Sequence, residues 1–421
     1  MKLFAWQERA VRDSDLKDGW GLFARPGTGK TLAALTIAQG AQLLPVVVCP
    51  KAVKSQWAAN GIEHIFHYEQ LRNAALFKQI AELLRANDCC LILDESHRIS
   101  NPSTKTSKAA LKLAPLAKKR LCLTGTPSAN SPADLWAQLR FLRPTDKLET
   151  RREWQDRYID SLSPQHPLMR HLRGNPFIAK KNRDGSVVLK NIDELSRRVA
   201  EYGTSIHDDE MEDLPDRTFV VRHCTPDQDL ARTYDELRRL CVTDIQGSPL
   251  TAENAAVLAT RLLRLASGLG ASDMTAKMDN PKLSQLIDDL PDFTSEGRVI
   301  IWSVWTHERA DLCQALEAMH VSWTDDVEKF LSLDHIRVLV GSPKKIGAGL
   351  NLQAATYQLW LSRTWSLIER EQALHRNYRV GQTSKTTVVD YVTDGTIDMA
   401  VMRALDAKHN LLSYIMKGII E

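Results

Sequence analysis

Apolar and polar positions divide the chain into two blocks in which short apolar runs alternate with stretches of helical periodicity. This alternation is typical of parallel α/β sheets. Because the runs are apolar on both faces, we expect strands that helices cover on each side. The predicted strands are WGLFA (20–24), PVVVC (45–49), CLILDE (90–95) and RLCLTGT (120–126) in the first block, and RVIIWS (298–303), IRVLVGS (336–342), YQLWLS (357–362) and TVVDYV (387–392) in the second.

The stretch between the blocks, residues 146–290, is more polar and mostly helical in pattern. It holds an acidic run, HDDEMEDLPD (207–216), without Lys or Arg. The segment NRDGSVVL (182–189) offers a turn followed by a strand, as in a hairpin. Two interpretations of the charge runs stay open, a functional pairing near nucleic acid and a solvated face. The basic run, residues 168–190, contains Arg170, Arg173, Lys180, Lys181, Arg183 and Lys190 against one acid, Asp184.

A phosphate-binding loop follows the first predicted strand, because RPGTGKT (25–31) leads into the helix-like TLAALTIAQ (31–39). Gly27 and Gly29 permit backbone angles that turn successive N–H groups toward one anion. The helix N-terminus adds its dipole. Lys30 is expected to reach the β- and γ-phosphates of a nucleotide, and Thr31 to ligate magnesium. The predicted nucleotide contacts here are Arg25, Pro26, Gly27, Thr28, Gly29, Lys30 and Thr31.

Two acids end the third predicted strand in LILDESH (91–97), at the edge of a parallel sheet where ligands bind. Asp94 is expected to hold magnesium through its water shell. Glu95 is expected to orient and deprotonate the attacking water, because phosphoryl transfer depends mostly on positioning and charge stabilisation. His97 is a candidate relay between the nucleotide and the next motif.

Composition narrows the class of protein. The chain has 421 residues, with 55 Lys and Arg against 52 Asp and Glu, so its net charge is +3 and nucleic-acid binding must rest on local patches. No window approaches the roughly 18 uninterrupted apolar residues of a membrane span. The N-terminal MKLFAWQERAVRD does not read as a signal peptide. The seven cysteines show no CxxC pair, and we expect reduced thiols.

The motifs in their order resemble the Swi/Snf-type ATPases of helicase superfamily two. DESH is followed by Arg98 and Asn101, where the family reads DEAH with an Arg and an Asn, and LTGTPSAN (123–130) is followed by LW and FLRP as in the family's third motif. FAWQERAV (4–11) matches the segment whose glutamine, here Gln7, reads adenine, and VVVCPKAVKSQW (46–57) matches the nucleic-acid-contacting motif Ia. IIWSVWTHERADL (300–312), GAGLNLQAA (347–355) and QALHRNYRVGQ (372–382) resemble motifs IV, V and VI.

Motif VI contributes two arginines to the implied ATP site. Arg376 and Arg379 are three residues apart, so on a helix they face the same way. In such ATPases they reach the γ-phosphate only when the cleft between two lobes closes, which ties hydrolysis to a domain motion. The implied catalytic residues are Lys30, Glu95, Arg376 and Arg379. The magnesium ligands are Thr31 and Asp94. The implied ATP-binding set adds to the loop residues Gln7, Asp94, Glu95, Gly349, Arg376 and Arg379.

The resemblance implies two RecA-like parallel-sheet lobes with a mostly helical insertion between them. Lobe one is expected at 1–145, the helical and basic-hairpin insertion at 146–215, and lobe two at 216–421 with a helical element at about 225–290. The expected cofactors are ATP and magnesium. The expected partner is double-stranded DNA, with RNA and single-stranded DNA left open, no membrane, and protein partners unknown. A minimal ATPase of this kind suits a bacterial or phage-infected host cytoplasm.

The expected function is a DNA-dependent ATPase that translocates along or remodels double-stranded DNA. A strand-separating helicase acting on DNA or RNA stays open, with residues 170–190 as its candidate wedge, and so does a non-hydrolysing adaptor that binds ATP or DNA. The candidate nucleic-acid contacts are Lys51, Lys54, Trp57, Ser103, Lys105, Asn130, Lys344 and Lys345.

Overall fold

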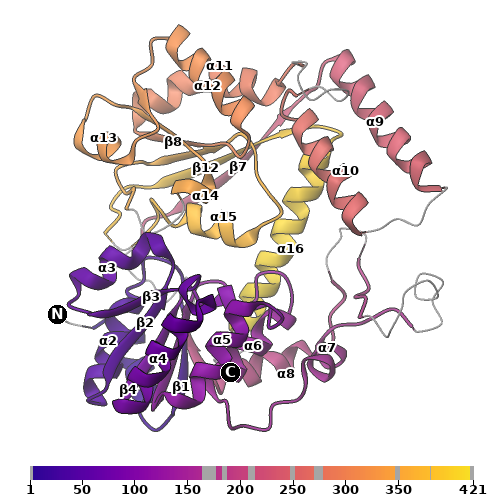
Figure 1. Ribbon diagram of the computed structural model, residues 1–421. Coiled ribbons are helices and arrows are strands. Elements are labelled where there is room, and N and C mark those ends of the chain that lie inside the picture. The colour runs from indigo at the N-terminus through magenta and orange to yellow at the C-terminus, as the bar shows by residue number, and fades with distance from the viewer. Residues whose placement is uncertain are drawn as a thin grey trace. The chain divides into compact units, whose positions relative to one another are not determined.

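The chain forms two compact units, each built around its own sheet (Figure 1). The computed structural model describes residues 3–163, 177–182, 187–206, 214–246, 252–269, 278–346, 351–379 and 381–417. Unit 1 comprises Met1–Glu212 and Asp406–Glu421, and unit 2 comprises Asp213–Leu405. Every strand pairing in both six-stranded sheets is parallel, which confirms the predicted α/β class with two parallel-sheet lobes.

The sheet of unit 1 has the strand order β3-β2-β4-β5-β1-β6. Its strands are β1 (Gly19–Phe23), β2 (Leu44–Cys49), β3 (His64–His67), β4 (Cys89–Asp94), β5 (Lys119–Thr124) and β6 (Gly203–Ser205). Each predicted strand of the first block is present. The strands that the pattern did not predict, β3 and β6, are the two outer strands.

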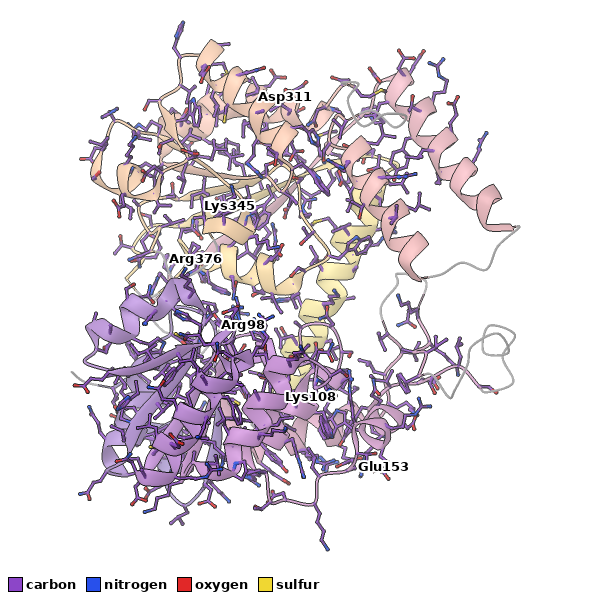
Figure 2. All side chains as sticks on the ribbon, in the orientation of Figure 1. Arg98, Lys108, Glu153, Asp311, Lys345 and Arg376 are labelled. Carbon is purple, nitrogen blue, oxygen red and sulfur yellow. The ribbon has the colours of Figure 1, made fainter. Side chains whose placement is uncertain are left out.

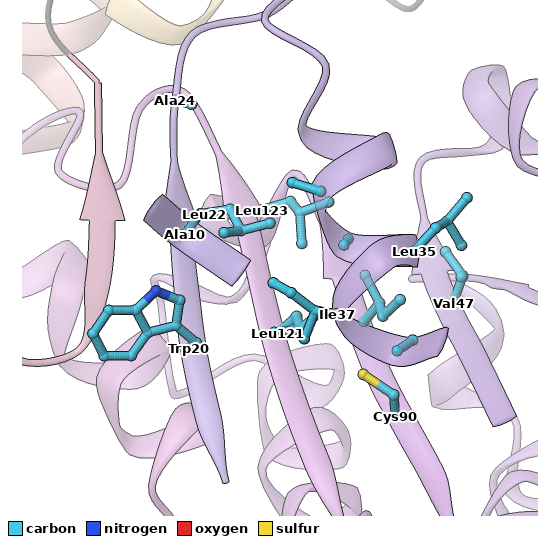
Figure 3. Close-up of a cluster of buried hydrophobic side chains, with 14 of the residues drawn as sticks. Ala10, Trp20, Leu22, Ala24, Leu35, Ile37, Val47, Cys90, Leu121 and Leu123 are labelled. Atoms are coloured by element: carbon cyan, nitrogen blue, oxygen red, sulfur yellow. The ribbon is translucent and has the colours of Figure 1, made fainter. Parts of the chain in front are cut away.

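Helices cover both faces of this sheet. They are α1 (Ala5–Ser14), α2 (Lys30–Gly40), α3 (Lys54–Ala59), α4 (Ala74–Ala86), α5 (Lys105–Leu113) and α6 (Ala133–Leu142). One face packs against α1 and α2 in a buried cluster that includes Leu22, Ile37 and Leu121 (Figure 3). On the other face α6 contacts β1 and β5 and packs beside α5. Helix starts carry side-chain caps, such as Asn73 for α4 and Thr104 for α5.

Residues 146–212, predicted as most of an insertion, group with unit 1. They supply α7 (Arg151–Tyr158), α8 (Ile192–Ala200) and the outer strand β6. An antiparallel bridge joins Lys181 to Val187 on either side of the predicted hairpin turn. Residues 183–186 of that turn, the basic residues Arg170 and Arg173, and residues 207–213 of the acidic run lie outside the described residues.

Two lysines of the basic run have local partners. Lys180 Nζ lies 2.7 Å from Asp160 Oδ2, and Lys190 Nζ donates to the Asp156 carbonyl oxygen at 2.7 Å. The Lys180 ammonium holds the pKa of Asp160 below its usual value. Part of the basic run is therefore engaged within unit 1.

The sheet of unit 2 has the strand order β7-β12-β11-β8-β10-β9. Its strands are β7 (Arg217–Cys224), β8 (Val299–Trp302), β9 (Trp323–Thr324), β10 (Val338–Gly341), β11 (Tyr357–Trp360) and β12 (Thr386–Thr393). Each predicted strand of the second block is present. Again the strands that were not predicted, β7 and β9, are the outer ones.

Alternate residues of the inner strands face opposite layers of helices in unit 2. Val299 and Ile301 pack in a cluster with α11 (Pro281–Glu296) and α12 (Thr306–Ala318). Ile300 and Trp302 pack in a second cluster with α13 (Val327–Ser332), α14 (Pro343–Ile346) and α15 (Leu367–Leu374). This arrangement is the physical reason why the strands read as apolar on both faces. The remaining helices are α9 (Gln228–Gln246), α10 (Ala252–Leu265) and α16 (Ile397–Lys417).

The last helix, α16, contributes to both units. Its residues from Asp406 onward group with unit 1, whereas the sequence division assigned all of 216–421 to lobe two. Within unit 1, Ser196 Oγ donates to the Ile415 carbonyl oxygen at 2.7 Å, and Ser205 Oγ donates to that of Met416 at 3.3 Å. Unit 2 is therefore inserted between two parts of unit 1 along the chain.

Candidate active site

The predicted motifs of unit 1 meet at one edge of its sheet. Strands β1, β5 and β4 are parallel neighbours, and the register aligns Phe23 with Thr124 and Asp94 with Leu123. The phosphate-binding loop, the DESH turn and the TGTP loop leave these strand ends side by side. The Ala24 N–H donates to the Thr124 carbonyl oxygen at 3.1 Å. A Cβ on Gly125 would lie 2.9 Å from Pro26 Cδ, so glycine permits this close approach of the two loops.

The phosphate-binding loop has the backbone that its glycines predict. Gly27 and Gly29 both have φ of +83°, in the left-handed region that favours glycine, and Gly29 caps the N-terminus of α2. The Lys30 ammonium donates to the carbonyl oxygens of Ala24 at 2.6 Å and Arg25 at 2.8 Å. Lys30 thus lies across the loop, with the first N–H groups of α2 beside it. This is the arrangement that a nucleotide's phosphates require.

Gln7 contacts this loop directly. Its side chain is fully buried, its Nε2 donates to the Gly29 carbonyl oxygen at 3.0 Å, and its Oε1 accepts the Phe4 N–H at 2.8 Å. A Cβ on Gly29 would lie 2.5 Å from Gln7 Nε2. Gln7 therefore ties the start of α1 to the loop, and its reading of adenine stays a prediction.

Asp94 is held by three hydrogen bonds. Its Oδ2 accepts the Trp57 indole N–H at 2.8 Å, its Oδ1 accepts the Glu95 N–H at 3.0 Å, and its carbonyl oxygen accepts the Tyr68 hydroxyl at 2.8 Å. Burial, and then the neighbouring Glu95 carboxylate, raise the pKa of Asp94 to about 6, while the Trp57 hydrogen bond and the nearby Lys30 charge oppose the rise. Hydrogen bonds fix the orientation of the Asp94 carboxylate, but they do not offset the cost of its buried negative charge. A cation beside it would therefore be stabilised.

Glu95 adopts a strained backbone, with φ of +54°. This conformation turns the chain sharply out of β4 and into a short 3-10 turn, Ser96–Ile99. The Glu95 carboxylate lies 3.4 Å from His97 Nδ1 and is partly exposed. The two acids thus have different partners, Trp57 for Asp94 and His97 for Glu95.

His97 connects the DESH turn to the TGTP loop. Its Nδ1 lies 3.0 Å from Thr124 Oγ1, and the Thr126 N–H donates to the same hydroxyl at 3.1 Å. Burial first, and then the Arg98 and Lys30 charges, lower the pKa of His97 to about 3. The imidazole is therefore neutral near pH 7, and it orients its neighbours without adding positive charge.

A buried amide that the sequence analysis did not single out joins the same motifs. Ser96 Oγ donates to Gln138 Oε1 at 2.8 Å, and Gln138 Nε2 donates to the carbonyl oxygens of Pro127 at 2.8 Å and Asp134 at 3.0 Å. Both side chains are fully buried. The only signals in the sequence are the Ser in DESH, where the family reads Ala, and a Gln on an otherwise apolar helix face.

The residues present fit a magnesium–nucleotide complex. Magnesium usually binds through one or two carboxylates together with substrate phosphates. Asp94 supplies a carboxylate at the edge of the sheet where α2 begins, and Thr31 lies in the first turn of that helix. Among the described residues, no group of three or more His, Cys, Asp or Glu side chains is placed to hold a metal ion. In sites of this kind the nucleotide phosphates and water supply the remaining ligands.

Motif VI lies in unit 2, and its local structure corrects one prediction. Helix α15 ends at Leu374, so Arg376 and Arg379 belong to the turn that follows it and do not share a helix face. The Leu352 N–H donates to the Arg376 carbonyl oxygen at 2.9 Å, and Gln353 Nε2 donates to that of Arg379 at 3.2 Å. The turn is thus attached to the end of motif V. Gly349, predicted to contact ATP, lies outside the described residues.

Two further side chains hold the motif VI turn. Gln382 Nε2 donates to the carbonyl oxygens of Gln353 at 3.0 Å and Asn377 at 2.9 Å, and Asn377 Nδ2 donates to that of Ala355 at 3.1 Å. Both are buried. The turn that carries the two arginines is therefore held by hydrogen bonds of these amides and not by the helix that the spacing of the arginines suggested.

A model of a known family matches a stretch that begins in unit 1 and ends in unit 2. Residues 78–269, which include the DESH and TGTP motifs, match the model described as SNF2-related domain. This stretch of the chain is therefore similar to SNF2-related domains. This match confirms the resemblance to Swi/Snf-type ATPases that the order of motifs indicated.

The relatives that this chain resembles are longer than the chain itself. The TATA-binding protein-associated factor mot1 of Aspergillus fumigatus is 24% identical over 77% of this chain and 20% of its own length. An uncharacterized ATP-dependent helicase of Mycoplasma genitalium is 22% identical over 96% of this chain and 40% of its own length. SWI/SNF-related matrix-associated actin-dependent regulator of chromatin subfamily A-like protein 1 of Xenopus laevis is 23% identical over 94% of this chain and 42% of its own length. The chain thus spans less than half of each of these relatives.

One solved structure can be superposed on most of this chain. The Sulfolobus solfataricus SWI2/SNF2 ATPase core in complex with dsDNA covers 98% of this chain and 92% of its own, with 19% identity and a TM-score of 0.41. Within the described part of the chain, no helix is both long and apolar enough to span a bilayer.

The residues predicted to contact nucleic acid are exposed to solvent, with one exception. Lys51, Lys54, Ser103, Lys105 and Asn130 are exposed in unit 1, on segments that follow the carboxyl ends of β2, β4 and β5. Lys344 and Lys345 are exposed on α14 of unit 2 (Figure 2).

Trp57 is the exception, and its predicted contact with nucleic acid is wrong. Only 1% of its surface is exposed, and its indole N–H is bonded to Asp94. Resemblance to motif Ia located the segment but could not tell which of its side chains face solvent.

Proposed function

We propose that this chain is a DNA-dependent ATPase that couples ATP hydrolysis to translocation along, or remodelling of, double-stranded DNA. The observation that carries the proposal is the assembly of the phosphate-binding loop, the DESH turn and the TGTP loop at one sheet edge, with direct hydrogen bonds between them. The SNF2-related match and the similarity to an ATP-dependent helicase support the same activity.

The side chains of unit 1 have distinct roles in this proposal. Lys30 bridges the β- and γ-phosphates, for which its place across the loop prepares it. Asp94 and Thr31 hold magnesium, which when bound neutralises charge on the phosphates. Glu95 orients the attacking water and accepts its proton, because it is the carboxylate beside Asp94 that the turn leaves partly exposed.

We assign Arg376 and Arg379 to the γ-phosphate on the basis of motif VI. They belong to the other unit of the chain, so hydrolysis would require a domain motion. Hydrogen bonds of Gln353, Asn377 and Gln382 to their turn support a positioned pair of guanidinium groups.

The DNA partner is proposed from the exposed cations at the sheet edge of unit 1 and on α14. Lysines, hydroxyls and backbone N–H groups of this kind contact phosphates and carry no base information. We therefore expect binding that depends little on sequence and falls steeply with salt, because neutralised phosphates release counterions.

The test is a phosphate-release assay of the purified chain with matched double-stranded DNA, single-stranded DNA and RNA at several salt concentrations. We expect the strongest stimulation by double-stranded DNA, declining as salt rises. Hydrolysis that no nucleic acid changes would contradict the proposal. Displacement of a paired strand in a parallel assay would instead indicate a strand-separating helicase.

A further inference from the structure

Trp57 is the only buried residue of α3, the short helix that motif Ia forms. The other residues of α3 are exposed, as is Lys51 just before it. The Trp57 ring packs in the main core cluster of unit 1, together with Val47 and Cys49 of β2. Trp57 is therefore the anchor through which this segment is attached to the lobe.

The same anchor ends on the carboxylate expected to hold magnesium. The Trp57 indole N–H donates to Asp94 Oδ2 at 2.8 Å, while Oδ1 accepts the Glu95 N–H at 3.0 Å. A carboxylate oxygen can accept two hydrogen bonds or ligands, so each oxygen keeps one position for a metal-bound water. An indole N–H can only donate. If α3 shifts, Asp94 must turn with it or lose this bond.

The exposed side of α3 has the charge that a phosphate backbone attracts. Lys54 begins the helix, Lys51 precedes it, and both ammonium groups are solvent-exposed. Trp57 is the third residue after Lys54, so a cation and the anchor lie within one turn of the same helix. A shift of the segment on DNA binding would therefore move Trp57 as well, because no flexible linker separates it from Lys54.

We propose that Trp57 is a positioning residue that couples the DNA-contacting segment Lys51–Ala59 to the Asp94 carboxylate, so that DNA on this segment changes how readily the site takes up magnesium. The inference rests on the proposed function and extends it, because it names a route by which DNA reaches the ATP site within one lobe. Outer partners of metal ligands commonly change metal affinity or activity about 10–100-fold when they are removed.

The chain offers a matched control for this role. Trp20 is also buried in the core cluster of unit 1, and its indole N–H donates to Thr204 Oγ1 at 2.9 Å, away from both acids. Trp57→Phe and Trp20→Phe therefore each remove one indole N–H from the same core. A merely structural role predicts the same behaviour for the two variants.

The experiment measures ATPase rate against magnesium concentration, with and without a fixed amount of double-stranded DNA, for the wild type and both variants. We expect Trp57→Phe to need about 10-fold more magnesium for half-maximal rate and to lose most of the response to DNA, while Trp20→Phe follows the wild type. Thermal unfolding of each variant across the same magnesium series, without ATP, reports folding and magnesium binding separately from turnover. Equal magnesium requirements in the two variants would overturn the inference.

A second pair of substitutions tests the coupling without touching the core. Lys51→Ala combined with Lys54→Ala alters exposed side chains only, and at equal DNA it should abolish the effect of DNA on the magnesium requirement. In the Trp57→Phe background the same change should add little, because residues that act through one contact are not additive. An unchanged DNA effect in the lysine variant would also overturn the inference. A wild-type chain without ATPase activity would instead contradict the proposed function.

Discussion

At the scale of single residues, Asp94 is a buried carboxylate whose negative charge a bound cation would stabilise. Its two oxygens accept hydrogen bonds from Trp57 and Glu95, yet burial and the Glu95 charge raise its pKa to about 6. The ionised form is therefore disfavoured in the folded protein relative to the unfolded chain. Binding of a divalent cation removes this penalty, which links folding of the edge to metal binding.

The first prediction follows from the sign of this shift. The folded pKa of Asp94, about 6, lies above the ordinary value of 3.8, so the folded state binds the proton more tightly and loses stability as pH rises between about 4 and about 6. Asp94→Asn avoids this loss. In magnesium-free buffer its thermal midpoint should exceed that of the wild type above pH 6, and the gap should shrink toward pH 4. Parallel curves of midpoint against pH would show that Asp94 is not destabilised by its charge.

The second prediction separates binding from chemistry. Glu95→Gln keeps the strained turn and its polar side chain but removes the base, so ATP should bind while hydrolysis falls by about 10²–10⁴-fold. Lys30→Ala should lose most nucleotide affinity as well, because the ammonium lies across the loop itself. Nucleotide titration and phosphate release measure the two effects. Near wild-type turnover in Glu95→Gln would remove Glu95 from the role of base.

Prediction from sequence was uneven among the residues of this edge. The glycines and acids were found because their chemistry depends on spacing in the chain. Trp57 was misassigned and Gln138 was not noticed, because their roles depend on which face of a helix packs against another segment. Periodicity over a helix as short as α3 does not fix that face.

At the scale of elements, the hydrophobic pattern found the inner strands of both sheets and missed the outer ones. An inner strand of a covered parallel sheet is apolar on both faces and forms a recognisable run. The outer strand β6 is Gly-Thr-Ser, and in β7 a run of only three apolar residues (219–221) lies between Arg217-Thr218 and Arg222-His223. Phe219 and Val221 of β7 are exposed. Short or polar strands of this kind are common at sheet edges and leave no continuous apolar signal.

The third prediction concerns the Ser96–Gln138 link between the DESH turn and α6. Ser96→Ala leaves the buried Gln138 carbonyl without its donor, so it should destabilise the protein by about 1–3 kcal/mol. Ser96→Ala combined with Gln138→Leu should cost less than the sum of the single changes, because the two side chains share one contact. Chemical denaturation measures both.

A serine of the same turn supplies the control for this pair. Ser100 Oγ donates to the His97 carbonyl oxygen at 2.6 Å, a local bond on a partly exposed residue. Ser100→Ala should change stability little. Strict additivity of the Ser96 and Gln138 changes would mean that their hydrogen bond contributes nothing to coupling the two motifs.

At the scale of the whole molecule, each unit holds part of the predicted ATP site. The phosphate-binding loop and both acids lie in unit 1, and Arg376 and Arg379 lie in unit 2. Sequence motifs assigned these residues to one site, although the spacing argument for a shared helix face was wrong. That the residues of the two units act at one site stays a prediction of motif order, which does not depend on local periodicity.

The fourth prediction tests that cooperation. Arg379→Ala should bind ATP and DNA almost normally but lose most DNA-stimulated turnover, since an arginine finger contributes about 10³–10⁵ in rate. Its rate without DNA should fall less, because the open form barely uses the arginine finger. DNA favours the closed form through higher affinity for it. Arg403→Ala changes an exposed arginine of α16 and should behave as the wild type. Failure of Arg379→Ala to bind ATP, or normal stimulation, would contradict the assignment.

The C-terminal helix sets an order for folding during translation. Ser196 and Ser205 of unit 1 donate to carbonyl oxygens of Ile415 and Met416, which are synthesised only after all of unit 2. At about 5–20 residues per second, the ribosome needs roughly 10–40 s to make the intervening stretch. Unit 2 thus has time to fold on the nascent chain while the α8–β6 part of unit 1 still lacks its last partner, so the lobe that is begun first is completed last.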